Sequence, residues 1–244
     1  SRGLGDVYKR QVSTCYVSGR HPGIFSENDL EKGQKFNNFY EETKYLAEIE
    51  VRARMHAGLP AVIYRPAIVV GDSRTGVTQK YDGPYVAIRL LLRQPGTAVM
   101  PLLSGADEAR LNLVPSDFVV GAIDHLSALP HSVGRTYQLA DPEPCTVSET
   151  VTLIGEATGR RVVRVPIAKS VARGALRGIP GLSRLTGIPP EALDYFDHPT
   201  HYSVQNAETD LQGSGFTVPR LSEYIETLVK FVRAHPEIGT GAMA

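Results

Sequence analysis

Tyr40 and Lys44 are the residues of this sequence whose types and spacing could support chemistry. They stand four positions apart at the start of the strongly helical run Phe39 to His56, so their side chains lie one above the other on one helix face. A phenol has an ordinary pKa of about 10, and a nearby ammonium lowers that pKa because it favours the phenolate. Such a tyrosine can exchange a proton with a substrate oxygen near neutral pH. Taken alone, the pair also fits two solvated residues of a surface helix.

The segments on either side of this helix argue against a chance pair. Residues Val12 to Val17 begin like a short buried strand, and Thr14 falls near its carboxyl end, where open α/β sheets place their ligands. Its hydroxyl can both donate a hydrogen bond and accept one. After the helix and the stop signal Gly58 to Pro60 comes Ala61 to Gly71, which is apolar except for Arg65. Such a run is typical of a parallel strand buried on both faces. The sequence therefore predicts a βαβ unit that carries the pair.

Three motifs in this unit resemble the extended short-chain dehydrogenase/reductase family. They are Ser13-Thr14 with Gly19, Asn38-x-Tyr40-x-x-x-Lys44, and Arg65-Pro66 with Val69 and Gly71. Within the family the sequence looks most like the branch of thioester reductases and male-sterility-type acyl reductases, on account of Gly71 to Gly76 and Asp82 to Tyr85. The resemblance extends from about Val12 to the C-terminus. It implies an α/β fold: the C-terminal part of a Rossmann-like doubly wound parallel sheet, with a smaller α/β substrate region.

The resemblance also implies a catalytic set. Tyr40 is the expected proton donor or acceptor, and Lys44 is expected to lower its pKa and to hydrogen-bond the nicotinamide ribose. Thr14 is expected to hold the substrate carbonyl or hydroxyl, with Ser13 as the less favoured holder. The other expected contacts are Ser13, Pro66, Ala67 and Ile68 toward the cofactor, and Cys15 and Arg110 toward the substrate. Arg110 falls where nucleotide-sugar enzymes of the family hold a phosphate.

The expected function is that of an NAD(P)-dependent oxidoreductase, which transfers hydride to or from a carbonyl or alcohol, with an acyl thioester or aldehyde as candidate substrate. The expected cofactor is NADP or NAD, and the sequence does not distinguish them. Two alternatives stay open. One is a nucleotide-sugar epimerase or dehydratase on the same scaffold. The other is a non-enzymatic NAD(P)-binding regulatory protein, although such proteins commonly lose the Tyr/Lys pair.

The N-terminal segment, residues 1–11, is expected to lie outside the fold. Asp6 to Gln11 reads like a translated sequencing-adapter end, and a disordered arm is the alternative. The family's Gly-x-x-Gly-x-x-Gly turn is absent, so we expect an N-terminally truncated fragment that is inactive alone. The expected domains are a catalytic half at 12–140, with a substrate-loop insertion at about 72–110, and a mainly substrate-binding region with a closing helix at 141–244.

Composition excludes several classes of protein. Lys plus Arg and Asp plus Glu number 26 each, so no basic field indicates a nucleic-acid or membrane partner. Two cysteines among 244 residues make neither a disulfide framework nor a metal site. Val77 replaces the lysine of a P-loop in the segment Gly71 to Thr78, which argues against a P-loop nucleotidase. We expect a cytoplasmic protein that acts on a small molecule, with a homodimer left open.

Further elements follow from periodicity and capping signals. The expected helices are Gly83 to Arg93, one that starts near Asp117, one capped by Thr146 and Glu149, and Leu221 to Ala234; the expected strands are Leu111 to Val114, Arg135 to Ala140 and Arg161 to Pro166; His21 to Phe36 reads as a surface loop.

Overall fold

The computed structural model describes residues 8–179, 193 and 198–239 of the chain. They divide into two compact units, between which the chain passes repeatedly. The first unit holds the described parts of 1–69, 116–142 and 199–218, and the second those of 70–115, 143–198 and 219–244. The expected insertion at about 72–110 thus lies within the second unit. The expected C-terminal region is divided differently, because 199–218 returns to the first unit.

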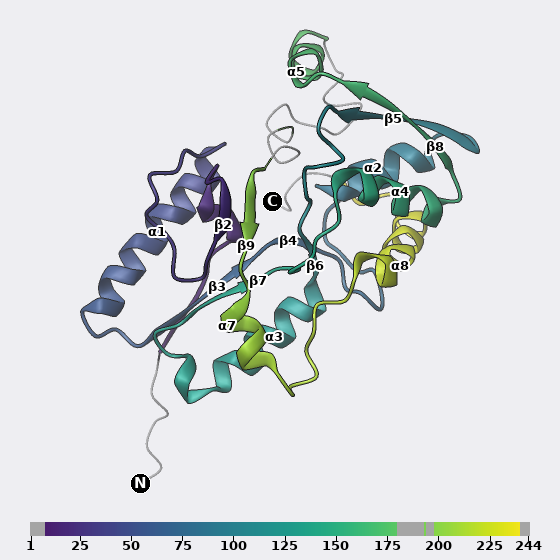
Figure 1. Ribbon diagram of the computed structural model, residues 1–244. Helices are drawn as coiled ribbons and strands as arrows, with labels where there is room; N and C mark the ends of the chain where they lie inside the picture. The colour runs from purple at the N-terminus through teal and green to yellow at the C-terminus, as the bar shows by residue number, and fades with distance from the viewer. Residues whose placement is uncertain (1–7, 180–192, 194–197, 240–244) are drawn as a thin grey trace. The chain divides into compact units, whose positions relative to one another are not determined.

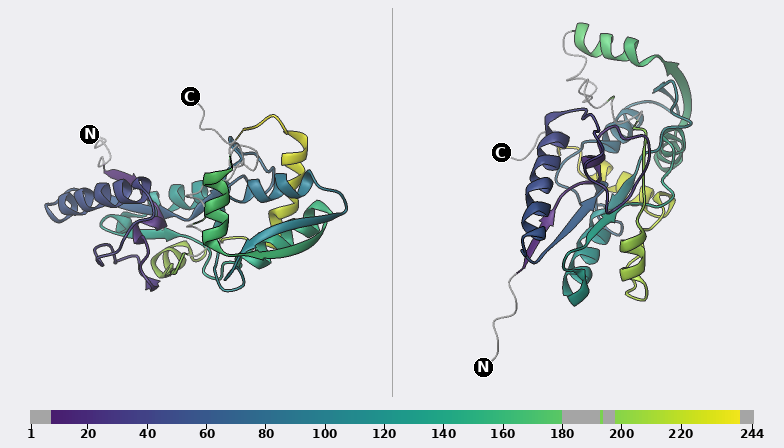
Figure 2. Two further views of the ribbon diagram at one scale, coloured as in Figure 1. Left: turned by 90° about the horizontal axis from the view of Figure 1, so that it is seen from above. Right: turned by 60° about the vertical axis from the view of Figure 1, so that its left-hand side comes forward.

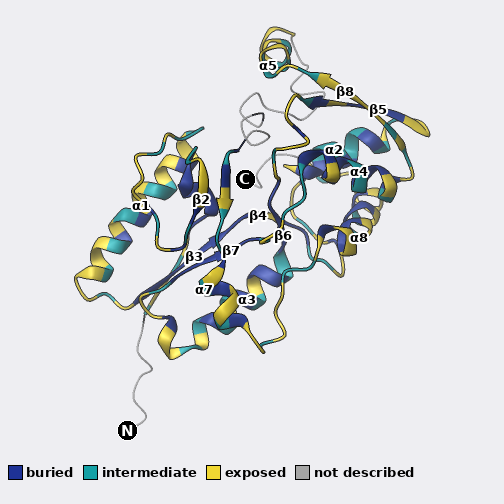
Figure 3. Cartoon of the chain, in the orientation of Figure 1, coloured by how far each residue is buried: buried dark blue, intermediate teal, exposed yellow. Residues whose placement is uncertain are grey.

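A parallel sheet forms the centre of the first unit. Its strands lie in the order β1-β3-β7, with β1 at Lys9–Val12, β3 at Ala61–Pro66 and β7 at Thr136–Leu139. Every residue of β3 and β7 is buried, as Figure 3 shows. The two continuous runs of the sequence are therefore interior parallel strands, and the expected α/β class is confirmed.

Helices cover both faces of this sheet: α1 (Phe39–His56), α3 (Ser116–Ala128) and α7 (Gln205–Leu211). Successive strand residues point to opposite faces, so Ile63 packs against Val51 of α1, whereas the Tyr64 hydroxyl lies 2.9 Å from the Ser127 hydroxyl of α3. Figures 1 and 2 show α1 on one side of the sheet and α3 with α7 on the other. By the same alternation, Arg65 points back toward α1.

The first strand starts earlier and ends earlier than expected. Lys9 to Gln11 pair with β3 in β1, which corrects the expectation that residues 1–11 lie wholly outside the fold; residues 1–7 are outside the described part of the chain. Parallel pairing uses backbone groups that every such residue has, so a polar Lys-Arg-Gln segment gave no strand signal. β1 stops at Val12, and Thr14 caps the short helix η1 (Cys15–Ser18) instead of ending a strand.

The predicted run from Ala61 to Gly71 is two strands, β3 and β4 (Ile68–Val70). Pro66 has no N–H with which to continue a ladder, and the Ala67 N–H donates to Leu139 at 3.0 Å. The expected loop from His21 to Phe36 contains a further strand, β2 (Gly23–Phe25), which pairs in parallel with β9 (Thr200–Tyr202).

The second unit is built on three helices that pack together: α2 (Pro84–Leu92), α4 (Val147–Thr158) and α8 (Leu221–Ala234). Beside them β5 (Thr97–Leu103) pairs in parallel with β8 (Arg161–Ile167). The described residues also form β6 (Leu113–Pro115), η2 (Pro130–Ser132) and α5 (Lys169–Gly178). The four helices and three strands that were predicted from Gly83 onward all exist, with ends within a few residues of those expected.

Helix α4 begins with the predicted capping box. The Thr146 hydroxyl accepts from the Glu149 N–H at 3.1 Å, and the Glu149 carboxylate accepts from the Thr146 N–H at 2.7 Å. We expect Thr146→Ala to lower the free energy of unfolding by about 1 kcal/mol, because one helix-end N–H loses its partner. Urea denaturation measures this, with Glu156→Ala, an exposed position in the last turn of α4, as control. An equal loss in both variants would contradict the role of the cap.

Among the described residues, no helix is long and apolar enough to cross a membrane.

Candidate active site

The first turn of α1 holds Tyr40 in place. The Asn38 side chain caps the helix by accepting from the Glu41 N–H at 3.0 Å. The buried Glu41 carboxylate accepts in turn from the backbone and side-chain N–H groups of Asn37, at 2.9 and 3.2 Å. A carboxylate in the first turn also complements the helix dipole. Tyr40 therefore projects from a fixed turn, and it is 55% exposed.

Lys44 reaches from the next turn of α1 to the end of β1. Its Nζ atom donates to the Val12 carbonyl at 2.8 Å. An ammonium has three N–H donors, so this bond leaves two for other acceptors. The bond fixes the ammonium on the face of α1 that also carries Tyr40, one turn further along the helix.

Besides its backbone pairing with β3, the segment from Val12 to Cys15 is joined to α1 and to β3 by one hydrogen bond that involves a side chain at each residue. The first two contacts go to α1 and the next two to β3. They are Val12 O with Lys44 Nζ at 2.8 Å, Ser13 Oγ with Glu48 Oε2 at 2.6 Å, Thr14 Oγ1 with Pro66 O at 3.4 Å, and Cys15 Sγ with Arg65 O at 2.9 Å. The structure thus gathers most of the predicted site residues into one network around this segment.

Thr14 lies at the centre of this network. Its hydroxyl donates to the Pro66 carbonyl at 3.4 Å and accepts from the Tyr16 N–H at 3.3 Å. The side chain is buried. Both bonds are longer than the usual hydrogen-bond distance, so they hold the hydroxyl weakly. The hydroxyl could therefore donate its hydrogen bond to a better acceptor instead of Pro66.

Two neighbours of Thr14 are placed differently from the sequence-based prediction. Cys15 is fully buried, and this burial raises the pKa of its thiol above the ordinary value. An enclosed thiol has no surface to offer a substrate, so the predicted contact of this side chain is corrected. The Ser13 hydroxyl donates to the buried carboxylate of Glu48, which directs it into the core instead of toward a cofactor.

The remaining predicted residues lie in two places. Pro66 and Ala67 are buried at the end of β3, with the Pro66 carbonyl facing Thr14, and Ile68 is half-buried at the start of β4. Arg110 belongs to the second unit, where it is exposed and its guanidinium donates to the Pro144 carbonyl at 2.7 Å. Its role toward a substrate stays a prediction.

The sequence-based prediction missed a buried ion pair beneath the site. Arg65 and Glu48 are both fully buried and meet at 2.6 Å. Arg52 adds a second guanidinium at 3.2 Å from the same carboxylate. The two arginines also donate to backbone carbonyls of the loop that follows β2, including that of Asp29. A lone charge in an apolar strand requires a partner, which is the signal that could have found the pair.

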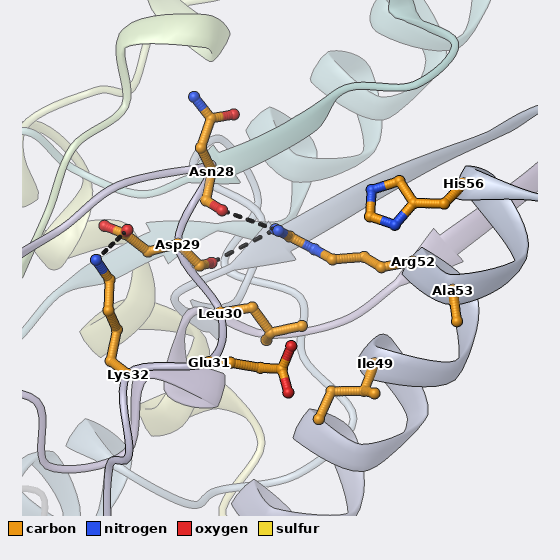
Figure 4. A pocket seen from close by; sticks show the side chains of 9 residues that line it. All are labelled: Asn28, Asp29, Leu30, Glu31, Lys32, Ile49, Arg52, Ala53 and His56. Atoms are coloured by element: carbon orange, nitrogen blue, oxygen red, sulfur yellow. Dashed lines mark hydrogen bonds and ion pairs between the residues drawn. The ribbon is translucent and has the colours of Figure 1, made fainter.

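A pocket of about 360 Å³ opens beside the C-terminal half of α1 (Figure 4). Its lining is mixed in charge, and it comprises Asn28, Asp29, Leu30, Glu31, Lys32, Ile49, Arg52, Ala53 and His56. The Arg52 guanidinium in its wall is occupied by carbonyl oxygens, as the dashed lines of Figure 4 show. None of the predicted catalytic residues lines this pocket.

Asp29 in this wall gives a pH-dependent prediction. Burial alone would raise its pKa, but the Lys32 ammonium at 2.7 Å and the Ser26 N–H outweigh burial and lower the pKa from 3.8 to about 2. A carboxyl whose folded pKa is depressed stabilises the fold above its unfolded pKa and loses that contribution as pH falls through the folded pKa. We expect Asp29→Asn to be less stable than the wild type at pH 7, with the difference shrinking between pH 3.8 and about 2.

Chemical denaturation at a series of pH values measures this difference. Lys32→Met should reduce the pH-dependent part, because it removes the main counter-charge. Stability curves of wild type and Asp29→Asn that run parallel through this pH range would contradict the assignment.

Within the described part of the chain, no group of three or more His, Cys, Asp or Glu residues is placed to hold a metal ion.

Comparisons with known proteins show what this chain is similar to. Residues 5–123 match the family model described as male sterility protein, an NAD-binding family. The aldehyde reductase lnbA of Aspergillus flavus is 29% identical over 161 residues, which are 65% of this chain and 14% of that protein. The match thus covers a small part of that relative's length.

Solved structures extend the likeness over nearly the whole chain. The terminal R domain from the myxalamid PKS-NRPS biosynthetic pathway superposes with a TM-score of 0.77 at 26% identity, covering 93% of this chain and 58% of that one. A dTDP-glucose 4,6-dehydratase from Bacillus anthracis shares the fold at 16% identity, with a TM-score of 0.63, covering 95% of this chain and 63% of that one.

Thr14, Tyr40 and Lys44 all lie within residues 5–123, the range that the family model matches. The chain is thus similar to the male sterility protein family over residues 5–123 and to an R domain of a PKS-NRPS pathway over 93% of its length.

Proposed function

We propose that this chain carries the catalytic residues of an NAD(P)-dependent reductase that reduces a carbonyl group, with Thr14, Tyr40 and Lys44 as its working set. The observation that supports the proposal most is the network around Val12 to Cys15. It ties the end of β1 to α1 through Lys44 and to β3 through Thr14. Lys44 and Thr14 are thereby tied to rigid elements, and Tyr40 stands on the same helix as Lys44, as a catalytic constellation requires.

In this proposal Tyr40 donates a proton to the substrate oxygen as that oxygen gains negative charge. Lys44 stabilises the phenolate that remains, because a positive charge one helical turn away favours the charged form. Thr14 holds the same oxygen with its hydroxyl, giving up its weak bond to Pro66. Two donors directed at a developing oxyanion stabilise the transition state more than the ground state.

The residues present fit a nicotinamide dinucleotide, NADP or NAD. When bound, the dinucleotide supplies the hydride. Lys44 has two N–H donors beyond its bond to Val12, which suits ribose hydroxyls. The backbone at Pro66 to Ile68 would border the cofactor, although the Pro66 carbonyl and the Ala67 N–H already have partners in Thr14 and Leu139.

The proposed substrate is an acyl thioester or an aldehyde. The support comes from the relatives, since one is named an aldehyde reductase and another is a terminal R domain from a PKS-NRPS pathway. A nucleotide-sugar epimerase or dehydratase is the competing reaction, because the dehydratase of Bacillus anthracis shares the fold.

A substrate panel tests the proposal. The full-length protein is incubated with NADPH or NADH and with acyl thioesters, aldehydes, or UDP- and dTDP-sugars, and cofactor oxidation and products are followed. We expect stoichiometric oxidation of reduced cofactor with thioesters or aldehydes. Conversion of a nucleotide sugar without net cofactor consumption would contradict the proposal and identify an epimerase or dehydratase. Cofactor binding without any turnover would favour a non-enzymatic regulatory protein.

A further inference from the structure

Glu48 continues the stripe of α1 that begins with Tyr40 and Lys44, one turn further along. The stripe passes from the surface into the core. Tyr40 is 55% exposed and Glu48 is fully buried. A carboxylate at such a depth needs partners for its charge, and the identity of those partners shows what Glu48 connects.

Both oxygens of the Glu48 carboxylate are held by side chains from three places in the first unit. Oε2 accepts from the Ser13 hydroxyl at 2.6 Å. Oε1 accepts from Arg65 Nη2 at 2.6 Å and from Arg52 Nε at 3.2 Å. Charge-assisted bonds of this length are strong and directional. The donors come from the end of β1, from β3 and from the next turn of α1, so the carboxylate has one orientation that satisfies all three.

We propose that Glu48 is a positioning residue for the reaction, which acts on Thr14 through its hydrogen bonds to Ser13 and Arg65. Ser13, which Glu48 holds, directly precedes Thr14; Arg65, which Glu48 also holds, directly precedes Pro66. The Thr14 hydroxyl and the Pro66 carbonyl are the two groups that face each other in the site. One buried carboxylate on α1 thus fixes both strand ends relative to the helix that carries Tyr40. This inference rests on the proposed reductase function.

The decisive variant is Ser13→Ala, because it cuts the link to Glu48 and leaves the buried Arg65–Glu48 pair intact, whereas Glu48→Gln also endangers folding. In the full-length protein with its preferred thioester or aldehyde, we expect Ser13→Ala to lower kcat about tenfold, since small misplacements of catalytic groups cost rate. The KM values and the midpoint of thermal unfolding should stay close to those of the wild type. Ser13→Thr keeps the hydroxyl and should restore most of kcat.

A double-mutant cycle completes the test. If Glu48 acts through Ser13, then Ser13→Ala adds no further loss of kcat in a Glu48→Gln background that still folds. Wild-type kcat in Ser13→Ala would overturn the inference. So would a raised KM for the cofactor, which would mean direct cofactor contact, or a loss of kcat that follows thermal stability and is not rescued by Ser13→Thr.

Tyr40→Phe in the same assay separates this inference from the proposed function. Full turnover in Tyr40→Phe would end the proposed function, and the inference with it. An inactive Tyr40→Phe beside an unaffected Ser13→Ala would overturn the role of Glu48 alone.

Discussion

Replacing Tyr40 by phenylalanine in the full-length protein should lower kcat by about 10²–10⁴-fold, the range that a positioned proton donor contributes. The change removes one hydroxyl from a side chain that is 55% exposed in the capped first turn of α1. Folding and cofactor affinity should therefore stay near those of the wild type. Steady-state kinetics, thermal unfolding and a cofactor titration measure the three quantities.

Tyr45→Phe is the matched control, because it removes the same hydroxyl from the same helix. The Tyr45 ring packs against Phe36, with ring centroids 4.9 Å apart, and the ring is kept in the variant. We expect its kcat to lie within about twofold of the wild-type value. Equal losses in the two variants would mean that Tyr40 acts through the helix and not as a proton donor.

Of the variants proposed, Glu48→Gln should lose the most stability, about 3–5 kcal/mol in the free energy of unfolding. The carboxylate that neutralises Arg65 becomes an amide whose NH₂ group faces donors, and the Arg65 side chain has no exposed surface. A guanidinium buried without its counter-charge is costly. Urea denaturation, with the slope checked for two-state behaviour, measures the difference.

Glu50→Gln provides the comparison on the same helix. Glu50 also pairs with an arginine, Arg54, at 2.7 Å, but the two side chains are 63% and 68% exposed. Such a pair contributes about 0.3–0.5 kcal/mol. Similar losses for the two glutamine variants would show that burial does not decide the strength of the Glu48 pair.

The helix that carries the candidate site could be predicted with its ends, because Asn38 provides a cap and the following run has strong helical propensity. The bounds of α1 agree with the expectation at both ends. The same holds for α8, whose apolar positions recur with helical spacing. Local signals of this kind depend only on residues that are close in sequence.

The short strands depend on distant residues, and the sequence did not predict them. β2 and β9 have three residues each and pair across about 177 positions of sequence. Their pairing joins residues 199–218 to the first unit, which is therefore built from stretches far apart in the sequence. The end of β1 at Val12 was likewise misplaced, because Val12 to Val17 looks apolar whether it is a strand or a short helix.

The residues of the candidate site differ in the same way, because some are indicated by local motifs and others depend on distant parts of the chain. Tyr40, Lys44 and Thr14 were predicted from motif spacing, and their role stays a prediction, whereas Glu48 was not predicted. Two features of the sequence pointed to Glu48. It follows Lys44 by one helical turn, and Arg65 is a lone charge in an apolar strand, which requires an anionic partner when it is buried. Several acidic residues occur in α1, and choosing among them requires the orientation of the helix on the sheet.

Deuterium transfer tests the proposed reaction most directly. The full-length protein is given cofactor deuterated at the transferable C4 position, with an aldehyde or acyl thioester, and the product is analysed by mass spectrometry and NMR. The account predicts one deuterium on the former carbonyl carbon per cofactor oxidised, in the wild type and in Tyr45→Phe, and almost none in Tyr40→Phe over the same time. Deuterium transfer at the wild-type rate in Tyr40→Phe would contradict it, as would its absence from every carbonyl product while a nucleotide sugar is converted.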